Sequence, residues 1–245
     1  NSDEEIGSRD STHQIRLMAR SANRVFVLEP AMGREGALKT ARKGLGRFTV
    51  TVRGQAAHAG LEPGKGASAI LELSLVIQKL FALNDIDGGV SVNVGTIDGG
   101  IRPNVVAAES KAVADVRVLT FKDAERVEAA IHGLTAETPG TTVHVEGYFG
   151  RPPMERTPGN RALFETAQSA ASELDIEIEQ ASAGGGSDGN TTSLFAPTLD
   201  GLGAVGEGAH APHEHLLVDR MVERSALLAC LLARPAQAPS EGSGS

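Results

Sequence analysis

Six segments with regular hydrophobic spacing follow one another between residues 44 and 150, and their order limits the possible folds more than any other feature of this sequence. The order is strand, helix, strand, strand, helix, strand. In the first strand apolar and polar residues alternate, so that Phe48, Val50 and Val52 share one face. This order belongs to the split βαβ, ferredoxin-like motif, and it predicts a complete small α+β domain at residues 44–150.

The helices and strands of this domain are expected where the hydrophobic period changes. After the first strand, the predicted elements are a helix at 66–83, strands at 90–97 and 105–119, a helix that begins at 120, and a strand at 142–148. In the first helix, an apolar face is expected from Ile70, Leu73, Ile77 and Leu80. Thr120 is the predicted N-cap of the second helix.

The segments on either side of this domain, residues 1–43 and 151–235, contain helices and short strands. The predicted elements are helices at 14–22, 160–174 and 219–233 and strands at 24–28, 176–178 and 198–202. We expect the two segments to form one α/β domain, which the ferredoxin-like domain interrupts. Residues 236–245, rich in Pro, Ser and Gly, are expected to be a disordered tail.

Composition excludes several kinds of partner. With 31 acidic and 23 basic residues the net charge is -8, and no cluster of Lys and Arg offers a surface for phosphate groups. Nucleic acids and anionic membranes are therefore not expected partners. No apolar run approaches the length of a transmembrane helix. Cys230 lies in an apolar segment, so we expect a buried, inert thiol.

Carboxylates and an imidazole of the two outer segments could together form a metal site. Asp3, Glu4 and Glu5 are consecutive, and on their own they would indicate a solvated surface. Glu29, however, ends a predicted strand, where a buried charge needs a counter-ion or a metal. His210 lies in a glycine-rich loop of the same domain. Glutamate and histidine are ligands that zinc accepts, so the combination indicates a metal centre.

Five short motifs resemble those of the co-catalytic zinc exopeptidase and deacylase family, and they occur in the family's order along the chain. This family includes glutamate carboxypeptidase, aminoacylase, acetylornithine deacetylase and succinyl-diaminopimelate desuccinylase. The motifs are Asp3-Glu4-Glu5-Ile6-Gly7-Ser8, Leu28-Glu29-Pro30, Gln55-Ala56-Ala57-His58-Ala59-Gly60, Arg102-Pro103-Asn104 through Ala114-Asp115-Val116-Arg117, and Gly206 to Glu214. The loop from Gly184 to Asn190 and the pair Gly99-Gly100 are similar to those of the glutamate carboxypeptidase-like members. The resemblance implies a zinc-exopeptidase-like catalytic domain with an inserted lid and dimerisation domain.

The resemblance implies metal-dependent hydrolysis of an amide bond next to a free carboxylate. A complete active site of this family holds two zinc ions, and other divalent ions are an open alternative. By the resemblance, Glu5 and His210 bind one ion and Glu29 binds the other. Glu4 would be the general base that takes a proton from the water between the two ions.

The resemblance also implies residues that hold the substrate, a small peptide or an N-acyl amino acid. His58 lies in the lid motif, and in the family this histidine reaches the active site of the partner subunit and stabilises the oxyanion. Asn104 and Arg117 would hold the substrate carboxylate, the arginine by a two-pronged contact. Gly185 and Gly186 are assigned to substrate binding. A homodimer through the lid domain is implied, with its first helix as the expected interface.

Two assignments have rivals within the sequence. His213 and His215 lie close to His210, which is preferred because it occupies the Gly-x-Gly-x-His position of the family. A serine hydrolase is a second possibility, since Ser187 lies in a Gly-x-Ser-x-Gly segment and is followed by Asp200 and His210. That alternative leaves the glutamates and the inserted domain unexplained.

A complete family member carries, before its Asp-Glu-Glu motif, a His-x-Asp segment with a zinc histidine and a later aspartate that bridges both metals. Neither precedes Asp3 in this sequence. We therefore expect this chain to be a fragment that holds metal weakly and is inactive or nearly so by itself, since affinity follows ligand number. A catalytically inert dimerisation or binding fragment is the alternative function.

Overall fold

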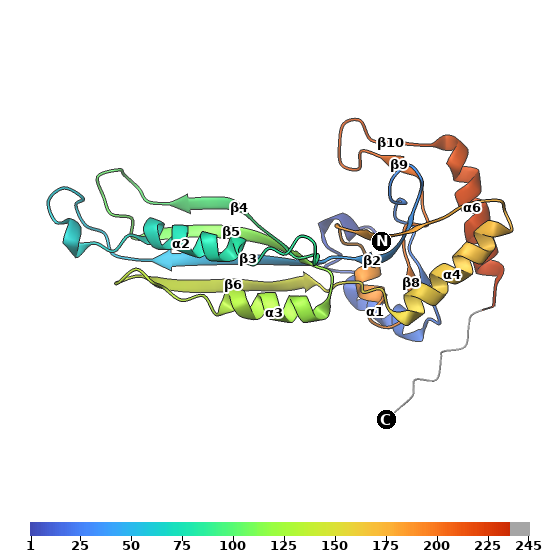
Figure 1. Cartoon of the computed structure of the whole chain (residues 1–245), viewed down its shortest axis with the longest axis horizontal. Helices are drawn as coiled ribbons and strands as arrows, with labels where there is room; N and C mark the ends of the chain where they lie inside the picture. The colour runs from blue at the N-terminus through green and yellow to red at the C-terminus, as the bar shows by residue number, and fades with distance from the viewer. Residues whose placement is uncertain (236–245) are drawn as a thin grey trace, which may run out of the picture. The chain divides into compact units, whose positions relative to one another are not determined.

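The computed structural model describes residues 1–235, which form two compact units. One unit consists of residues 1–43 together with the chain from Pro153 onward, and the other is Gly44–Pro152 (Figure 1). None of the helices in the described residues is long and apolar enough to cross a membrane. The tail predicted at 236–245 lies outside the described part of the chain.

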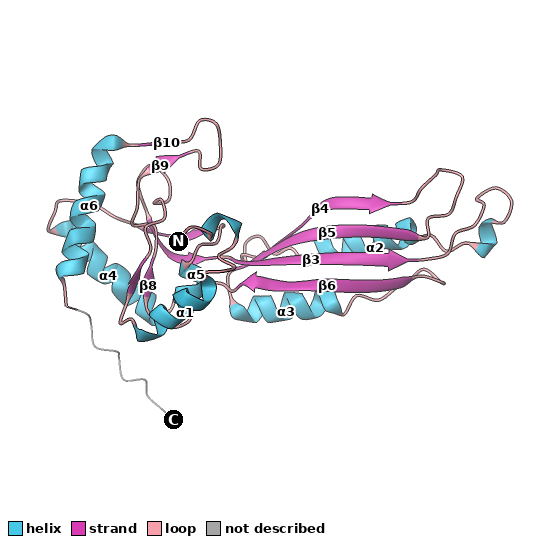
Figure 2. Cartoon of the chain, turned by 180° about the vertical axis from the view of Figure 1, so that it is seen from behind, coloured by secondary structure: helices cyan, strands magenta, loops and turns pink. Residues whose placement is uncertain are grey.

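The unit Gly44–Pro152 contains an antiparallel sheet and two longer helices. Its elements are β3 (Gly44–Arg53), the 3-10 helix η2 (Pro63–Lys65), α2 (Ala69–Phe81), β4 (Ser91–Gly99), β5 (Glu109–Val118), α3 (Phe121–His132) and β6 (Thr142–Arg151). The strands lie in the order β4-β5-β3-β6, each antiparallel to its neighbours. Figure 2 shows them side by side. This is the ferredoxin-like order, so the fold predicted for this segment is confirmed.

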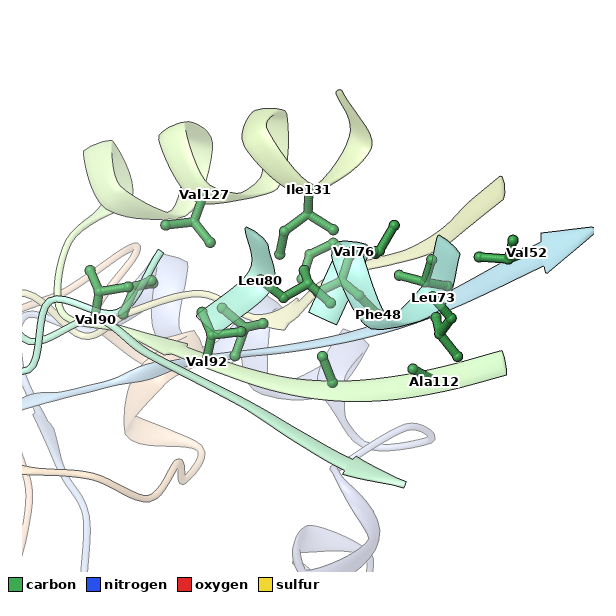
Figure 3. Close-up of a cluster of buried hydrophobic side chains, with 14 of the residues drawn as sticks. Phe48, Val52, Leu73, Val76, Leu80, Val90, Val92, Ala112, Val127 and Ile131 are labelled. Atoms are coloured by element: carbon green, nitrogen blue, oxygen red, sulfur yellow. The ribbon is translucent and has the colours of Figure 1, made fainter. Parts of the chain in front are cut away.

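Helices α2 and α3 cover one face of this sheet, and the core lies between helices and strands (Figure 3). Phe48, Val50 and Val52 of β3 all point to this side and are 0% exposed. Leu80 of α2 and Ile131 of α3 pack against them. Removing these apolar side chains from water is the main driving force for folding of this unit.

The core-facing side of α2 differs from the predicted one. Ile70 is 48% exposed, whereas Ala69 and the charged residue Glu72 are buried. The Glu72 carboxylate accepts hydrogen bonds from the backbone N–H of Glu137 at 3.1 Å and of Thr138 at 2.6 Å. Burial disfavours the charged form, but the hydrogen bonds from Thr138 and Glu137 outweigh it and lower the pKa of Glu72.

The other unit combines short strand pairs with helices. Its elements are η1 (Glu4–Ile6), α1 (Thr12–Ser21), β1 (Val25–Phe26), β2 (Leu38–Arg42), α4 (Pro158–Ser172), β7 (Gln180–Ala183), α5 (Gly189–Thr192), β8 (Thr198–Leu199), β9 (Gly206–Glu207), β10 (His215–Leu216) and α6 (Val218–Ala233). Strand β1 pairs with β8 and β2 with β7, both parallel, while β9 and β10 are antiparallel. The core of this unit includes Leu38, Phe164, Leu199, Leu227 and Leu231.

One strand prediction in this unit needs correction, and one strand was not predicted. Residues 176–178 are not a strand, because the chain first pairs with β2 at Gln180–Ala183. Strand β2 itself is not predicted from the pattern, since polar residues interrupt its apolar run. Thr40 and Arg42 are nevertheless buried, at 0% and 3% exposure, so both need hydrogen-bond partners from elsewhere in the fold.

Candidate active site

The turn that carries Glu4 and Glu5 is the short helix η1, which a glycine closes. Gly7 donates its N–H to the carbonyl of Glu4 at 2.8 Å, in a left-handed conformation with φ 96° that favours glycine. The carboxylate of Asp3 accepts hydrogen bonds from the N–H groups of Asp10 at 2.9 Å and Ser11 at 3.2 Å. Asp3 therefore braces the turn that presents the two glutamates.

Glu29 lies on an extended segment that continues β1. Its carbonyl accepts a hydrogen bond from the N–H of Gly203 at 2.9 Å. Burial raises the pKa of Glu29, and the negative charges of Asp200 and Glu4 add to the shift. A carboxylate whose charge is disfavoured in this way is stabilised by a nearby cation, so Glu29 is suited to bind a metal ion.

His210 lies in the loop between β9 and β10, with a left-handed backbone that is uncommon for any residue but glycine, φ 63°. Its Nε2 is 3.8 Å from Oε2 of Glu5, and the two side chains are 79% and 78% exposed. Two ligands of one tetrahedral zinc ion lie about 3.3 Å apart, so a small rotation of these exposed side chains lets them share an ion. The ring of His215, one of the rival ligands, instead contacts the carbonyl of His213 at 3.1 Å.

Glu4, Glu5 and Glu29 line one cavity of about 850 Å³ in this unit. Asp188 also lines it, and much of the remaining wall is apolar, formed by residues of α1, β1 and α6. The structure thus brings the predicted base and two predicted ligands to one cavity, and places His210 against Glu5. The donor types fit zinc. No three or more His, Cys, Asp or Glu side chains within residues 1–235 are arranged to hold a metal ion by themselves.

A buried ion pair between Arg42 and Asp200 is not predicted from the sequence. Arg42 Nε and Nη2 donate to the two carboxylate oxygens at 2.7 and 3.0 Å, and the side chains are only 4% and 0% exposed. Ser187 donates its hydroxyl to the same carboxylate at 2.6 Å and is itself 0% exposed. A hydroxyl shielded from solvent and bonded to Asp200 argues against the serine-hydrolase alternative. In the sequence, Arg42 and Asp200 each stand beside residues that form the core, and nothing local pairs them.

The glycine-rich loop after β7 is tied to the same ion pair. Arg42 Nη1 donates to the carbonyl of Gly185 at 2.9 Å. A side chain added at Gly185 would meet no atom within 4 Å, so there is open space on that side of the loop. Gly186 is half-buried. Asp188, in the same loop and on the cavity wall, is absent from the predicted site residues.

In the unit Gly44–Pro152, the segments of His58 and Asn104 lie side by side, and the N–H of Ala59 donates to the carbonyl of Asn104 at 3.0 Å. Nδ1 of His58 accepts hydrogen bonds from the N–H groups of Gly60 and Leu61, both at 3.1 Å. With Nδ1 acting as an acceptor, the neutral ring carries its proton on Nε2. The outer nitrogen of His58 is therefore a hydrogen-bond donor.

Arg117 lies far from Asn104 within this unit. Strand β5 begins at Glu109, and Arg117 is roughly 27 Å farther along it at the usual rise per residue. Asn104 precedes the start of that strand, which increases the separation. Arg117 Nε donates to Asp115 at 2.8 Å. Within one chain, Asn104 and Arg117 are therefore too far apart to contact the same substrate carboxylate.

The chain is similar in sequence to known peptidases. Residues 40–143 match the peptidase dimerisation domain of the M20 type. Carboxypeptidase G2 of Pseudomonas sp. (strain RS-16) is 27% identical over 218 residues, which cover 86% of this chain and 52% of that protein. The chain spans about half the length of the curated relatives that it matches along most of its own length.

Two solved structures share the fold. Aminopeptidase PepT from Bacillus cereus ATCC 10987 has a TM-score of 0.79 at 24% identity, covering 94% of this chain and 61% of that chain. The YxeP protein of Bacillus subtilis, described as a dinuclear metal binding peptidase from the M20 family, has a TM-score of 0.66 at 16% identity, covering 93% and 61%. Similarity at this level of identity establishes the fold, and the predicted fold class is confirmed.

Proposed function

This chain carries the dimerisation domain and the fold of the M20 peptidases, and from that premise we propose that it belongs to a metal-dependent hydrolase of amide bonds next to a free carboxylate. The reaction is that of a carboxypeptidase or of an N-acyl amino acid deacylase. The observation that carries this proposal is the meeting of Glu4, Glu5 and Glu29 at one cavity, with His210 beside Glu5. The similarity to carboxypeptidase G2 supports it.

We infer that Glu5 and His210 hold one divalent ion and that Glu29 holds a second, zinc being an ion that suits carboxylate and imidazole donors. When bound, such ions polarise the scissile carbonyl and lower the pKa of water. Further donors are needed, because residues 1–235 form no cluster of three. The relatives are about twice as long as the matched part, which supports donors from a segment outside this sequence.

In this proposal Glu4 moves the proton. Its carboxylate lines the cavity with Glu5 and Glu29, and its charge contributes to the raised pKa of Glu29, so it is close to the ligands. A carboxylate in that place takes the proton of the attacking water and passes it to the leaving amine. The closed turn η1 fixes the backbone from which Glu4 acts.

The distance between Asn104 and Arg117 in the lid domain divides the proposed substrate contacts of this domain into two groups. We propose that His58 and Asn104 act as a pair, with Nε2–H of His58 as a donor to the developing oxyanion. Arg117, at the other end of β5, makes a different contact with the substrate. In a homodimer, the pair would serve the active site of the partner subunit, and the match to a dimerisation domain supports such a dimer.

We propose that the dimer forms through α2 and β4. Within residues 1–235, strand β4 lies at the edge of its sheet and pairs with β5 alone. Leu71 of α2 is 54% exposed, Ile97 of β4 is 62% exposed, and Ile101, just after β4, is 84% exposed. An open strand edge beside exposed apolar side chains is typical of a surface that another chain covers.

Hydrolysis of N-acyl-glutamate and folate-like substrates tests the proposed function. Residues 1–245 in excess zinc are expected to turn over these substrates no faster than their Glu4→Gln variant, since the donors present do not complete the site. In a protein completed to the length of the relatives, turnover should be chelator-sensitive and fall roughly 10²–10⁴-fold on Glu4→Gln. Normal turnover of that variant, or inactivation of the parent by a serine-directed covalent probe, would refute the proposal.

A further inference from the structure

The residues just after Glu4 and Glu5 have an uncommon backbone conformation. Gly7 has φ 96°, and Ser8, which is not a glycine, has φ 52°. A non-glycine residue in the left-handed region costs free energy and persists only where its surroundings hold it there. Ser8 is 2% exposed, so the surroundings that hold it are contacts with the protein rather than with water.

The side chain that holds Ser8 belongs to Asp188, in the glycine-rich loop. Ser8 Oγ donates to Asp188 Oδ1 at 2.5 Å, and the side-chain amide of Asn1 donates to Asp188 Oδ2. One carboxylate thus takes hydrogen bonds from both sides of the Glu4–Glu5 pair. Backbone bonds complete the turn, from the N–H of Ser8 to the carbonyl of Asp3 at 2.8 Å and from Thr12 to Ser8 at 2.9 Å.

The side chains of Asp188 and its neighbour Ser187 form hydrogen bonds with different parts of the fold. The hydroxyl of Ser187 accepts from the N–H of Gly189 at 2.9 Å and donates to the buried carboxylate of Asp200 at 2.6 Å, so Ser187 fixes the loop. Asp188 instead lines the cavity that also contains Glu4. Although Asp188 stands at the N-cap of α5, its side chain makes no capping hydrogen bond. The carboxylate of Asp188 is therefore not needed for the loop's own conformation.

We propose that Asp188 is a positioning residue of the active site. Through Ser8, its carboxylate fixes the turn η1, and the turn sets Glu5 against His210 and Glu4 in the cavity. Both oxygens of Asp188 accept hydrogen bonds from residues on either side of the turn, so the carboxylate anchors the turn. This inference rests on the proposed function, because the roles of Glu4 and Glu5 come from it.

Hydrogen exchange and Co²⁺ binding, both on the purified 245-residue chain, test the role of Asp188. Without metal, Asp188→Ala and Ser8→Ala should each accelerate exchange of the amides at residues 3–12 at least tenfold, while β3 in the other unit keeps its protection. The double variant should show little change beyond that of Asp188→Ala, because both substitutions remove the hydrogen bond between Ser8 and Asp188. With Co²⁺ alone as probe, both variants should bind the ion at least fivefold more weakly, with an altered visible absorption spectrum. Ser193→Ala is the matched control, because it removes a hydroxyl at the end of α5 that, among the described residues, donates only to the nearby carbonyl of Asn190, at 3.4 Å.

The outcomes separate this inference from the proposed function. If Asp188→Ala and Ser8→Ala exchange and bind Co²⁺ like the parent while Glu5→Gln loses the Co²⁺ spectrum, the anchor is refuted and the ligand assignment stands. If Glu5→Gln and His210→Ala leave the spectrum unchanged, the ligand assignment fails, and exchange at residues 3–12 still decides the anchor. If Asp188→Ala does not fold, Ser8→Ala alone decides, since it keeps the carboxylate in place.

Discussion

Arg42 and Asp200 form a two-pronged ion pair from which water is excluded, with bonds of 2.7 and 3.0 Å. The pair also ties Ser187 and the carbonyl of Gly185 to strand β2, so it holds together the glycine-rich loop and the end of β8. The cost of removing both charges from water largely offsets their attraction. Breaking the pair, however, leaves one charge buried without compensation.

We predict that Asp200→Asn destabilises the unit that contains β2 by about 3–5 kcal/mol, because the guanidinium of Arg42 stays buried. Urea dependence of amide exchange in β2 measures this loss separately from the other unit. The exposed pair of Arg117 and Asp115 provides the control, where Asp115→Asn should cost less than about 1 kcal/mol. Equal effects of the two substitutions would contradict the structural role of the buried pair.

The buried carboxylate of Glu72 predicts a pH dependence in the lid domain. Its folded pKa lies below the unfolded value of about 4.3, so its contribution to stability is present above that pH and is lost as the pH falls through the folded pKa. At pH 7, Glu72→Gln should destabilise this unit by about 1–3 kcal/mol, because the N–H groups of Glu137 and Thr138 lose a charged acceptor. As the pH falls through the folded pKa of Glu72, the stabilities of the variant and the parent should converge.

Unfolding of the full chain between pH 3 and 8, followed by exchange of the β3 amides, measures this dependence. Glu125→Gln, at an exposed position of α3, is the matched control and should leave the profile unchanged. A constant difference between Glu72→Gln and the parent over the whole range would show that the carboxylate does not titrate as predicted.

Substitution of Ile97 tests the proposed dimer. A lysine there places a charge on the exposed edge strand β4, so Ile97→Lys should weaken association at least tenfold. Tyr148 lies on β6, at the opposite edge of the same sheet, and is 69% exposed. Sedimentation equilibrium at micromolar concentration should show a dimer for the parent and for Tyr148→Ser, and a monomer for Ile97→Lys. A monomeric parent with a folded lid domain would rule out the dimer.

Much of the lid domain follows from local sequence patterns. Strand β3 alternates as predicted, and the hydroxyl of Thr120 accepts a hydrogen bond from the N–H of Asp123 at 3.0 Å, as expected of an N-cap. The prediction for α2 was wrong at Ile70, which is exposed, while Glu72 is buried in the core-facing side of the helix. The Glu72 carboxylate is held there by a hydrogen bond from the backbone N–H of Thr138, far along the chain. Local periodicity cannot report a polar group whose partners are distant in sequence.

In the candidate site, too, some features were predicted from local sequence and others were not. Short motifs were enough to single out Glu4, Glu5 and Glu29, and the structure brings them to one cavity. The anchor between Ser8 and Asp188 was missed, since it joins segments that are separated by most of the chain. The distance between the lid residues Asn104 and Arg117 was missed as well, because it depends on the path of β5 and not on the type of either residue.

The position of zinc in crystals of this chain soaked with the ion tests the central claim most directly. Anomalous scattering at the zinc edge should give a peak about 2.0–2.2 Å from a carboxylate oxygen of Glu5 and about 2.0–2.1 Å from a ring nitrogen of His210. The peak should disappear in His210→Ala and remain in His213→Ala. A peak at His213 or His215 without Glu5, or one that survives in His210→Ala, would contradict the assignment of this site.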